Sequence, residues 1–271
     1  MRHPDKSRPE KGNRTRLRSV FVSDVHLGSS DCRAQELLEF FAGIETDYLF
    51  LVGDIVDFWS LRRAFHWPQE HNDVLRAVLA MAREGTKVIY VPGNHDEDIR
   101  EFCGSQFGNL AIRRRYVHST ADGREFLVMH GDEFDTAVKC SRWLAKFGAV
   151  AYELTMRANR AVNACRRLLR MPYWSLATSL KMSLGSALRY VEAFEIAAAQ
   201  AARSRNLDGV ICGHIHRAGV RQIDGVLYCN DGDWVESCTA LVESPGGQLS
   251  LWRHGTALAP REAADLLEVA A

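Results

Sequence analysis

Short apolar runs alternate with amphipathic stretches over the first third of the chain. Three runs end in polar residues or glycine and are typical of buried strands of a parallel sheet: Leu17–Ser23, Tyr48–Val52 and Lys87–Val91. Between them, Ala34–Gly43 and Asn72–Gly85 carry apolar residues at helical spacing and stop at a glycine. This alternation of strand and helix predicts right-handed crossovers and a mainly parallel sheet.

The pattern changes in the rest of the chain. Ile112–Thr120 and Arg124–His130 flank the turn dipeptide Asp122-Gly123, which predicts a hairpin. Five short strands are expected near the C-terminus: Val210–Cys212, Val220–Ile223, Val226–Cys229, Thr239–Glu243 and Leu249–Arg253. We therefore expect an α/β (α+β) fold in which two sheets pack face to face, with helices outside.

The stretch between these two regions, residues 136–205, has a helical pattern of its own. Apolar residues recur every three or four positions from Trp143 to Leu168, and again from Leu180 to Phe194. We interpret it as a helical lid inserted into the α/β body. The predicted organisation is a disordered basic arm (1–16), a core (17–135 and 206–271) and the lid (136–205).

Composition narrows the class of protein only slightly. The 271 residues include 34 Lys and Arg and 34 Asp and Glu, so net charge indicates no particular partner. Seven scattered cysteines without a C-x-x-C pair favour a reducing compartment over a disulfide framework or zinc finger. The basic N-terminus lacks the apolar stretch of a signal peptide, and no apolar run is long enough to span a bilayer. The expected location is the cytoplasm.

Polar clusters follow the predicted strands at five places. They are Asp24-Val-His26, Gly53-Asp54, Gly93-Asn94-His95-Asp96, His130-Gly131-Asp132 and Gly213-His214-Ile-His216. Sites in open α/β sheets lie at the carboxyl ends of strands, and all five clusters are expected there. Each cluster alone is a weak signal, because such residues are usually solvated or hydrogen-bonded. All five in this order are far more specific.

Carboxylates, an amide and imidazoles dominate these clusters, and thiolates are missing from them. Such donors suit Mn²⁺, Fe or Zn²⁺ better than Ca²⁺ or an iron–sulfur cluster. Two metal ions side by side need a bridging ligand, and a carboxylate can provide one. Asp54 is the natural candidate, because Gly53 allows the backbone to approach closely.

The ordered set resembles the calcineurin-like metallophosphoesterase superfamily over most of the chain outside the arm and lid. The resemblance implies two divalent metal ions. One would be held by Asp24, His26, Asp54 and His216, and the other by Asp54, Asn94, His130 and His214. It also implies that His95 stabilises the phosphoryl group or protonates the leaving oxygen, with Asp96 orienting its imidazole.

Two segments bear on the substrate. The stretch from Lys139 to Arg189 contains ten basic residues and one acidic residue, Glu153. A cationic lid would hold an anionic substrate or rest on an anionic membrane. An equally good interpretation is that its apolar stripe packs on the body and its arginines are solvated.

The segment after Asp54 combines aromatic and basic residues from Phe58 to Pro68. Trp59 would stack on a base, and Arg62 and Arg63 would pair with a diphosphate. A packed loop explains the same residues equally well.

Within the superfamily, the motif spacing and the lid look most like the branch of UDP-2,3-diacylglucosamine diphosphatases of lipid A synthesis. That resemblance implies Mn²⁺ and work at the inner face of the membrane. One departure is that an arginine follows the motif asparagine in the well-known form, whereas His95 stands here. A general phosphodiesterase or phosphatase is the main alternative. A nuclease or nucleic-acid-binding protein ranks low, because no nucleic-acid module is recognisable. A non-catalytic metal-stabilised scaffold ranks lowest. The sequence does not indicate an oligomeric state.

Overall fold

The computed structural model describes residues 14–135 and 177–256. The chain divides into two compact units, of which the first is Met1–Asp132 with Ala198–Ala271 and the second is Glu133–Ala197. The first unit carries both sheets. Among the described residues, no helix is both long and apolar enough to cross a membrane.

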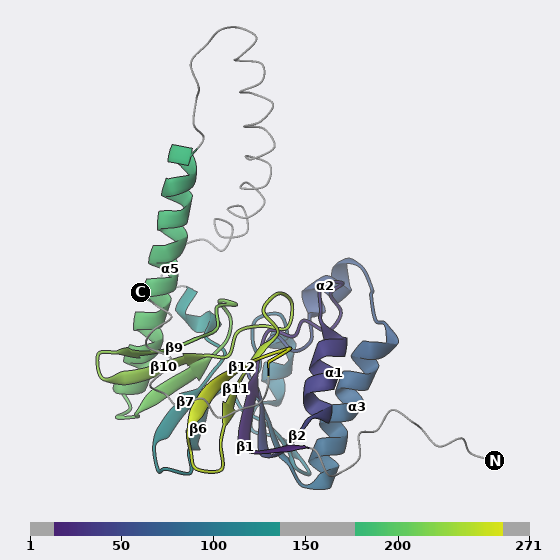
Figure 1. Ribbon diagram of the computed structural model, residues 1–271. Coiled ribbons are helices and arrows are strands. Elements are labelled where there is room, and N and C mark those ends of the chain that lie inside the picture. Colours follow the sequence, from purple (N-terminus) through teal and green to yellow (C-terminus); the bar gives the residue numbers. More distant parts are fainter. Residues whose placement is uncertain (1–13, 136–176, 257–271) are drawn as a thin grey trace, which may run out of the picture. The chain divides into compact units, whose positions relative to one another are not determined.

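Seven strands form the first sheet, in the order β12-β11-β1-β2-β3-β5-β4. Figure 1 labels β1, β2, β11 and β12 among them. β1, β2, β3 and β5 run parallel to one another, and the outer pairs are antiparallel. The strand bounds are β1 Thr15–Val22, β2 Ile44–Leu51, β3 Lys87–Tyr90, β4 Gln106–Phe107, β5 Leu110–Ile112, β11 Thr239–Glu243 and β12 Leu249–Arg253. The central parallel strands are the ones whose ends carry the first three motifs.

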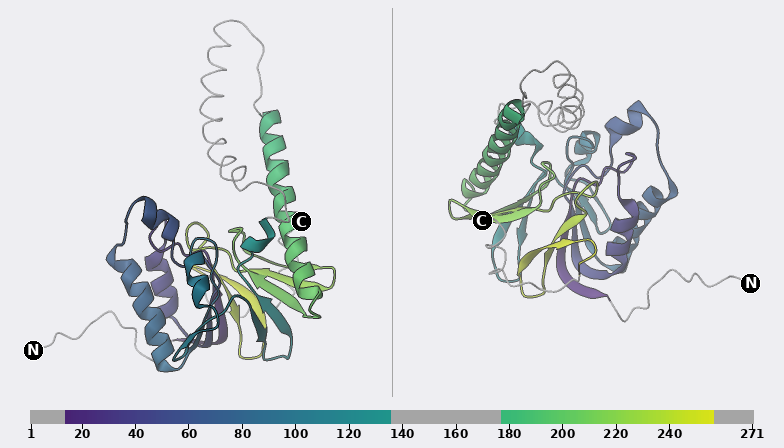
Figure 2. Two further views of the ribbon diagram at one scale, coloured as in Figure 1. Left: turned by 180° about the vertical axis from the view of Figure 1, so that it is seen from behind. Right: turned by 45° about the horizontal axis from the view of Figure 1, so that its top comes forward.

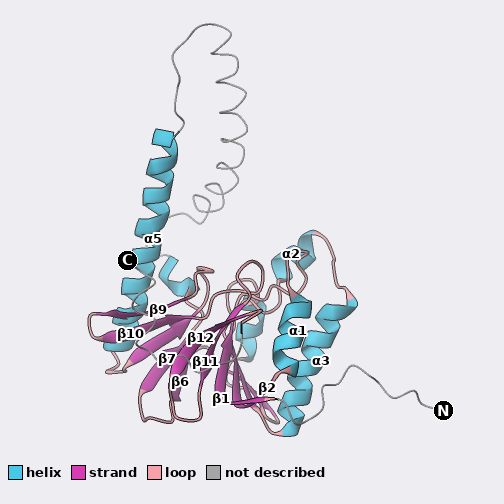
Figure 3. Ribbon diagram, viewed as in Figure 1, coloured by secondary structure: helices cyan, strands magenta, loops and turns pink. Residues whose placement is uncertain are grey.

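Helices α1 (Ala34–Ala42) and α3 (Gln69–Glu84) lie side by side on one face of this sheet (Figure 3). Their apolar sides enter the core through residues such as Leu37, Phe40 and Val74. Two short elements follow the motifs at the strand ends: α2 (Phe58–Arg63) and the 3₁₀ helix η1 (Glu97–Phe102).

Five strands form the second sheet, in the order β6-β7-β8-β10-β9. Their bounds are β6 Tyr116–Ser119, β7 Glu125–Val128, β8 Gly209–Cys212, β9 Gly219–Ile223 and β10 Val226–Asn230. β7, β8 and β10 are parallel, so β7 and β8 also present their carboxyl ends together. Figure 2 shows the two sheets from two further sides.

Two core layers explain why the central strands are apolar without alternation. In β1, Val20 and Val22 pack in the layer beneath the helices, whereas Phe21 packs in the layer that also contains Phe126 and Ile211 of the second sheet. Successive side chains of a strand point to opposite faces, so a strand covered on both faces is apolar throughout. The expectation of two sheets packed face to face with helices outside is confirmed.

Within the described residues, the predicted strands and helices are observed with small shifts at their ends, but two boundaries were wrong. Ile112–Thr120 is not one strand: β5 ends at Ile112 in the first sheet and β6 starts at Tyr116 in the second. The expected arm (1–16) is too long, because β1 begins at Thr15. There Arg16 donates a 2.8 Å hydrogen bond to Glu45 of the neighbouring strand, which favours the extended pairing.

The second unit contributes η2 (Asp132–Asp135) and most of α5 (Ala177–Arg203). The second of the two expected lid helices falls within α5. There Tyr190 donates a 2.6 Å hydrogen bond to Asp135, and the rings of Phe134 and Phe194 meet edge to face. The first expected helix lies outside the described residues, and the role of this segment as a lid stays a prediction.

Candidate metal centre

The carboxyl ends of five strands from both sheets carry the motif residues. Asp24 and His26 follow β1, and Asp54 follows β2. The remaining positions are Asn94, His95 and Asp96 after β3, His130 after β7, and His214 and His216 after β8. The loops are laced together by backbone hydrogen bonds, such as His26 N–H to the Asp54 carbonyl at 2.9 Å and Gly213 N–H to the His130 carbonyl at 3.2 Å. Residues nearly 200 positions apart are thereby held at one place.

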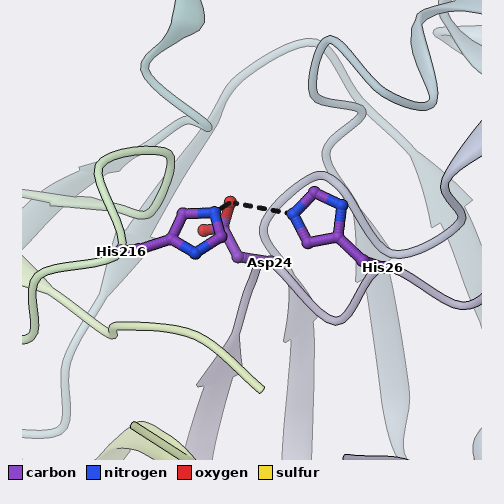
Figure 4. A group of neighbouring side chains, drawn as sticks. All are labelled: Asp24, His26 and His216. Atoms are coloured by element: carbon purple, nitrogen blue, oxygen red, sulfur yellow. Dashed lines mark ion pairs between the residues drawn. The ribbon is translucent and has the colours of Figure 1, made fainter. Parts of the chain in front are cut away.

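One group of three side chains brings Asp24, His26 and His216 together (Figure 4). Asp24 Oδ1 lies 3.1 Å from His216 Nε2 and 3.9 Å from His26 Nε2. The two imidazoles approach the same carboxylate oxygen from different loops. Three donor atoms that converge in this way are a suitable arrangement for a divalent cation.

A second group contains Asp54, His130 and His214. Asp54 Oδ2 lies 3.4 Å from His130 Nε2, and the rings of His130 and His214 are 5.0 Å apart and nearly perpendicular. Asn94, the remaining expected ligand, is buried in the turn after β3. The two groups contain six of the seven metal ligands expected from the sequence.

Three buried atoms of these groups have no partner in good hydrogen-bond geometry among the described residues, although Asp24 Oδ1 lies 3.1 Å from His216 Nε2: Asp24 Oδ1, His26 Nε2 and His130 Nε2. Buried polar atoms normally have partners, and leaving one unpaired costs about 1–3 kcal/mol. Oxygen and imidazole nitrogen are donors that divalent transition metals accept. The residues present therefore fit bound metal ions.

The outer nitrogens of two histidines fix which nitrogen faces the centre. His130 Nδ1 lies 2.8 Å from the carbonyl oxygen of Val52, which can only accept, so Nδ1 carries the proton. His26 Nδ1 lies 3.2 Å from Asp57 Oδ2. In both rings Nε2 is the nitrogen whose lone pair is available to a metal ion. This is the usual arrangement for a metal-binding histidine.

The backbone at the centre adopts conformations that are uncommon away from glycine. Five of the expected ligands have left-handed backbone angles, with φ between 50° and 72°: Asp24, His26, Asp54, His214 and His216. Such angles are rare outside glycine and cluster at functional sites. Gly93 is required for space, because a Cβ there would collide with the Asp54 carboxylate and lie 2.7 Å from the His130 ring.

The electrostatics of the centre favour added positive charge. Burial alone lowers the pKa of His130, but the adjacent charge of Asp54 outweighs it and raises the pKa to about 10. Burial opposes protonation of His216 too, yet Asp24 raises its pKa to about 9. The carboxylates therefore favour the protonated, cationic forms of the two histidines. A metal ion would compete with these protons for the same nitrogens.

The carboxylate beside His95 is Asp57, and the expectation that Asp96 orients His95 was wrong. Asp57 Oδ1 lies 2.9 Å from His95 Nδ1. Asp96 instead accepts hydrogen bonds of 2.6–3.3 Å from the Tyr90 hydroxyl and from the N–H groups of Gly93, Asp54 and Ile55. Its four acceptor positions hold the loops after β2 and β3 together.

Residues 17–218 match the model of the calcineurin-like phosphoesterase family. The chain belongs to this family. It is therefore a hydrolase that acts on phosphoester or diphosphate bonds, and its family uses divalent metal ions.

Individual relatives are more distant. The phosphoesterase is 26% identical to the UDP-2,3-diacylglucosamine hydrolase of Neisseria gonorrhoeae, over 84% of this chain and 94% of the relative. It is 25% identical to the DNA polymerase II small subunit of Thermoplasma acidophilum, over 79% of this chain and 44% of the relative. It also resembles a solved archaeal phosphodiesterase, with 14% identity, a TM-score of 0.41, and coverage of 87% of this chain and 98% of that one.

Among the expected substrate-binding residues, Trp59 packs against His95 with the ring planes tilted and the centroids 4.3 Å apart. Arg62 forms an exposed ion pair with Asp98, and Arg63 is exposed. Their role toward substrate stays a prediction. The residue that sequence reasoning missed in this phosphoesterase is Asp57. Its only signals were its place three residues after Asp54 and its suitability as the N-cap of a helix.

Proposed function

We propose that this phosphoesterase hydrolyses the diphosphate of UDP-2,3-diacylglucosamine, or of a similar acylated sugar linked to a nucleotide, with two metal ions. The observation that carries the metal-dependent part is the set of unpartnered donor atoms of Asp24, His26 and His130. Support for the substrate comes from the relative named UDP-2,3-diacylglucosamine hydrolase, which matches over nearly its whole length.

In this proposal Asp24, His26, Asp54 and His216 hold one metal ion, and Asp54, Asn94, His130 and His214 hold the other. Mn²⁺ is the expected metal, with Fe or Zn²⁺ as alternatives for the same donors. When bound, such ions supply Lewis acidity toward phosphate oxygens and toward water. Asp54 is the proposed bridge, because it belongs to the second group and its carboxylate also interacts electrostatically with Asp24 and His26 of the first group.

His95 is the proposed catalytic residue. With its Nδ1 directed at the Asp57 carboxylate, its Nε2 faces the centre and lies 4.0 Å from Asp54 Oδ2. From there it would donate a hydrogen bond to the phosphoryl group or a proton to the leaving oxygen. Burial raises the pKa of Asp57, but hydrogen bonds from His26 and His95 outweigh the effect and hold it below its usual range, so Asp57 is a charged acceptor beside the ring.

The substrate-facing residues in this proposal are Arg62 and Arg63. They lie on the same short helix, α2, as Trp59, whose indole packs against His95. Arg62 would exchange its exposed partner Asp98 for a phosphate oxygen, which costs little because exposed ion pairs are weak. We further propose that the protein works in the cytoplasm at an anionic membrane surface, where an acylated substrate resides.

The deciding experiment is hydrolysis of UDP-2,3-diacylglucosamine by Mn²⁺-loaded protein in mild detergent. A generic aryl phosphodiester is assayed in parallel, and His95→Ala is the matched control. Release of UMP by the wild type but not by the variant would support the proposal. Cleavage of the generic ester alone would retain the metal-dependent hydrolase and reject the lipid substrate.

A second candidate is a nuclease. It is favoured by the likeness to a DNA polymerase subunit, although this chain spans less than half of that protein. Single-stranded DNA in the same assay tests it. Cleavage that falls steeply with added salt would support the nuclease, since contacts with a phosphate backbone depend strongly on salt.

A further inference from the structure

The first turn of α2 holds His95 by three separate contacts. The Phe58 N–H donates a 3.1 Å hydrogen bond to the His95 carbonyl. Asp57 Oδ1 lies 2.9 Å from the ring nitrogen Nδ1. The indole of Trp59 packs on the imidazole at 4.3 Å between centroids, with the planes tilted by 34°. One contact fixes the backbone, one a ring nitrogen and one the ring itself.

The start of α2 and the orientation of His95 depend on the same carboxylate. Asp57 is the N-cap of the helix and accepts a 2.7 Å hydrogen bond from the Ser60 N–H and a 2.9 Å bond from the Ser60 hydroxyl. At the other end, Arg62 pairs with Asp98 of η1, three residues beyond His95. The short helix is therefore attached at both ends to the segment that carries His95.

Trp59 has no buried core position that would explain it as packing. None of the α2 side chains is buried, and Trp59 itself is 42% exposed. Its ring contact is with His95, whose imidazole also meets the ring of His26 edge to face at 4.6 Å. Aromatic pairs at such separations prefer defined relative orientations. The imidazole thus contacts two rings, and its Nδ1 faces a carboxylate.

We propose that Trp59 is a positioning residue, which keeps the His95 imidazole turned with Nε2 toward the candidate metal centre. This inference rests on the proposed role of His95. Asp57 limits the direction of Nδ1 but leaves the ring free to tilt about that contact, and the indole face removes this freedom. Loss of the indole would impair the step that uses His95. The metal ligands and the proposed substrate contacts of Arg62 and Arg63 would stay in place.

The test compares Trp59→Leu with Trp59→Phe, using Phe107→Leu as the matched control. Phe107 is another exposed aromatic residue, on the edge strand β4 and outside the metal centre. On the substrate that the Mn²⁺-loaded protein cleaves, Trp59→Leu should lower kcat by about 10- to 100-fold, with KM changed by less than about threefold. Trp59→Phe should recover most of the rate, because it restores a ring face, and the control should match the wild type.

A double-mutant cycle decides whether Trp59 acts through His95. In a His95→Ala background, Trp59→Leu should change kcat by less than about twofold, because the group that it positions is gone. If the loss persists in that background, or if Trp59→Leu raises KM and spares kcat, Trp59 contacts the substrate directly and the proposal is overturned.

A second readout does not depend on turnover. In Zn²⁺-loaded protein, the His95 Hε1 resonance, assigned by its loss in His95→Ala, should move when Trp59→Leu removes the indole ring current. An unchanged resonance would overturn the positioning role. A wild-type protein that cleaves no phosphoester would instead refute the proposed function, and the resonance would still report whether Trp59 packs on His95.

Discussion

Two buried polar clusters contain similar side chains but differ in how completely these side chains are hydrogen-bonded. Around Glu243, every carboxylate oxygen is satisfied: Oε1 accepts 2.8 Å hydrogen bonds from Arg18 and the Ala121 N–H, and Oε2 accepts from Ser19 and His118. At the metal centre, Asp24 Oδ1 and two imidazole nitrogens are buried without a partner in good hydrogen-bond geometry among the described residues. A network in which every buried polar atom has a partner stabilises the fold. A network with unpartnered buried atoms indicates a bound ligand.

Their positions in the fold explain the difference. Glu243 lies on β11 of the first sheet, and His118 lies on β6 of the second, so this cluster ties the two sheets together within their strands. Strand residues are held by regular pairing and find partners across the interface. The metal-centre residues lie on loops beyond the strand ends, where side chains from several elements converge on one point. A serine, a histidine and a carboxylate therefore do not by themselves make a catalytic site.

The largest effect is expected from Asp54→Asn. This change removes a charge from the second group and the proposed bridge between the groups, so hydrolysis should fall by more than about 100-fold. Metal analysis of the purified variant should show less than the wild-type content. Added Mn²⁺ should raise the Tm of the wild type, as any ligand of the native state does, and leave the variant nearly unchanged. Full metal content in the variant would contradict the bridging role.

Replacing His95 by Ala should lower kcat by about 100- to 10,000-fold, the range attributed to general acid–base catalysis. Metal content should stay at the wild-type level, because His95 belongs to neither of the two proposed ligand sets. Measuring both quantities on one preparation separates chemistry from metal binding. Loss of metal would move His95 into the ligand set.

Asp57→Asn is expected to lower activity by about 10- to 100-fold, less than the loss of His95 itself. An amide keeps the hydrogen bond to the Ser60 N–H and so keeps the helix cap, but it carries no charge for the two imidazoles. Circular dichroism should report an unchanged fold. Asp96→Asn is the informative comparison, because Asp96 bonds to backbone N–H groups and the Tyr90 hydroxyl. Its defect should appear as a lower Tm.

The smallest effect on activity is expected from Glu243→Gln, which should cleave substrate at the wild-type rate and yet unfold more easily. The loss is about 2 kcal/mol in the free energy of unfolding, because hydrogen bonds to a charged group are replaced by weaker ones. Burial raises the pKa of Glu243, but hydrogen bonds from His118, Ser19 and the Ala121 N–H hold it below its ordinary value of 4.5. Its stabilising effect is therefore full above pH 4.5 and is lost as the pH falls through the lower folded-state pKa.

Acid titration of the Tm measures this contribution. Below pH 4.5 the wild type should lose stability more steeply than Glu243→Gln, and the two curves should converge. Parallel curves would mean that another group is responsible for the acid sensitivity. A large activity loss in Glu243→Gln would break the distinction between the two clusters.

The sequence predicted the parallel strands and their motif ends, because a strand covered on both faces is apolar throughout and stops at polar residues. It did not predict that the chain changes sheets between Ile112 and Tyr116, since alternation alone does not reveal which sheet a strand joins. Nor did it predict α2, because six residues are too few for a helical period to appear.

Within the site, the residue types in the motifs were enough to select the side chains that gather at the strand ends. Which carboxylate faces which histidine was not predictable. Asp96 is adjacent to His95 in sequence, yet the tight turn directs it to backbone N–H groups of the loops after β2 and β3. Asp57 is distant in sequence, and only the path of α2 brings it to the ring.

The left-handed backbone at five of the expected ligands implies a trade-off between catalytic activity and thermal stability in this protein. Each such residue costs on the order of 1 kcal/mol relative to glycine, so the five together approach the net stability of a typical domain. Selection for heat resistance alone would favour glycine at His214 or His216 and so discard the donor atoms. Evolved or engineered variants that gain thermal tolerance at these positions should therefore be catalytically silent, and the fastest variants should be those that gain their stability from the two core layers instead.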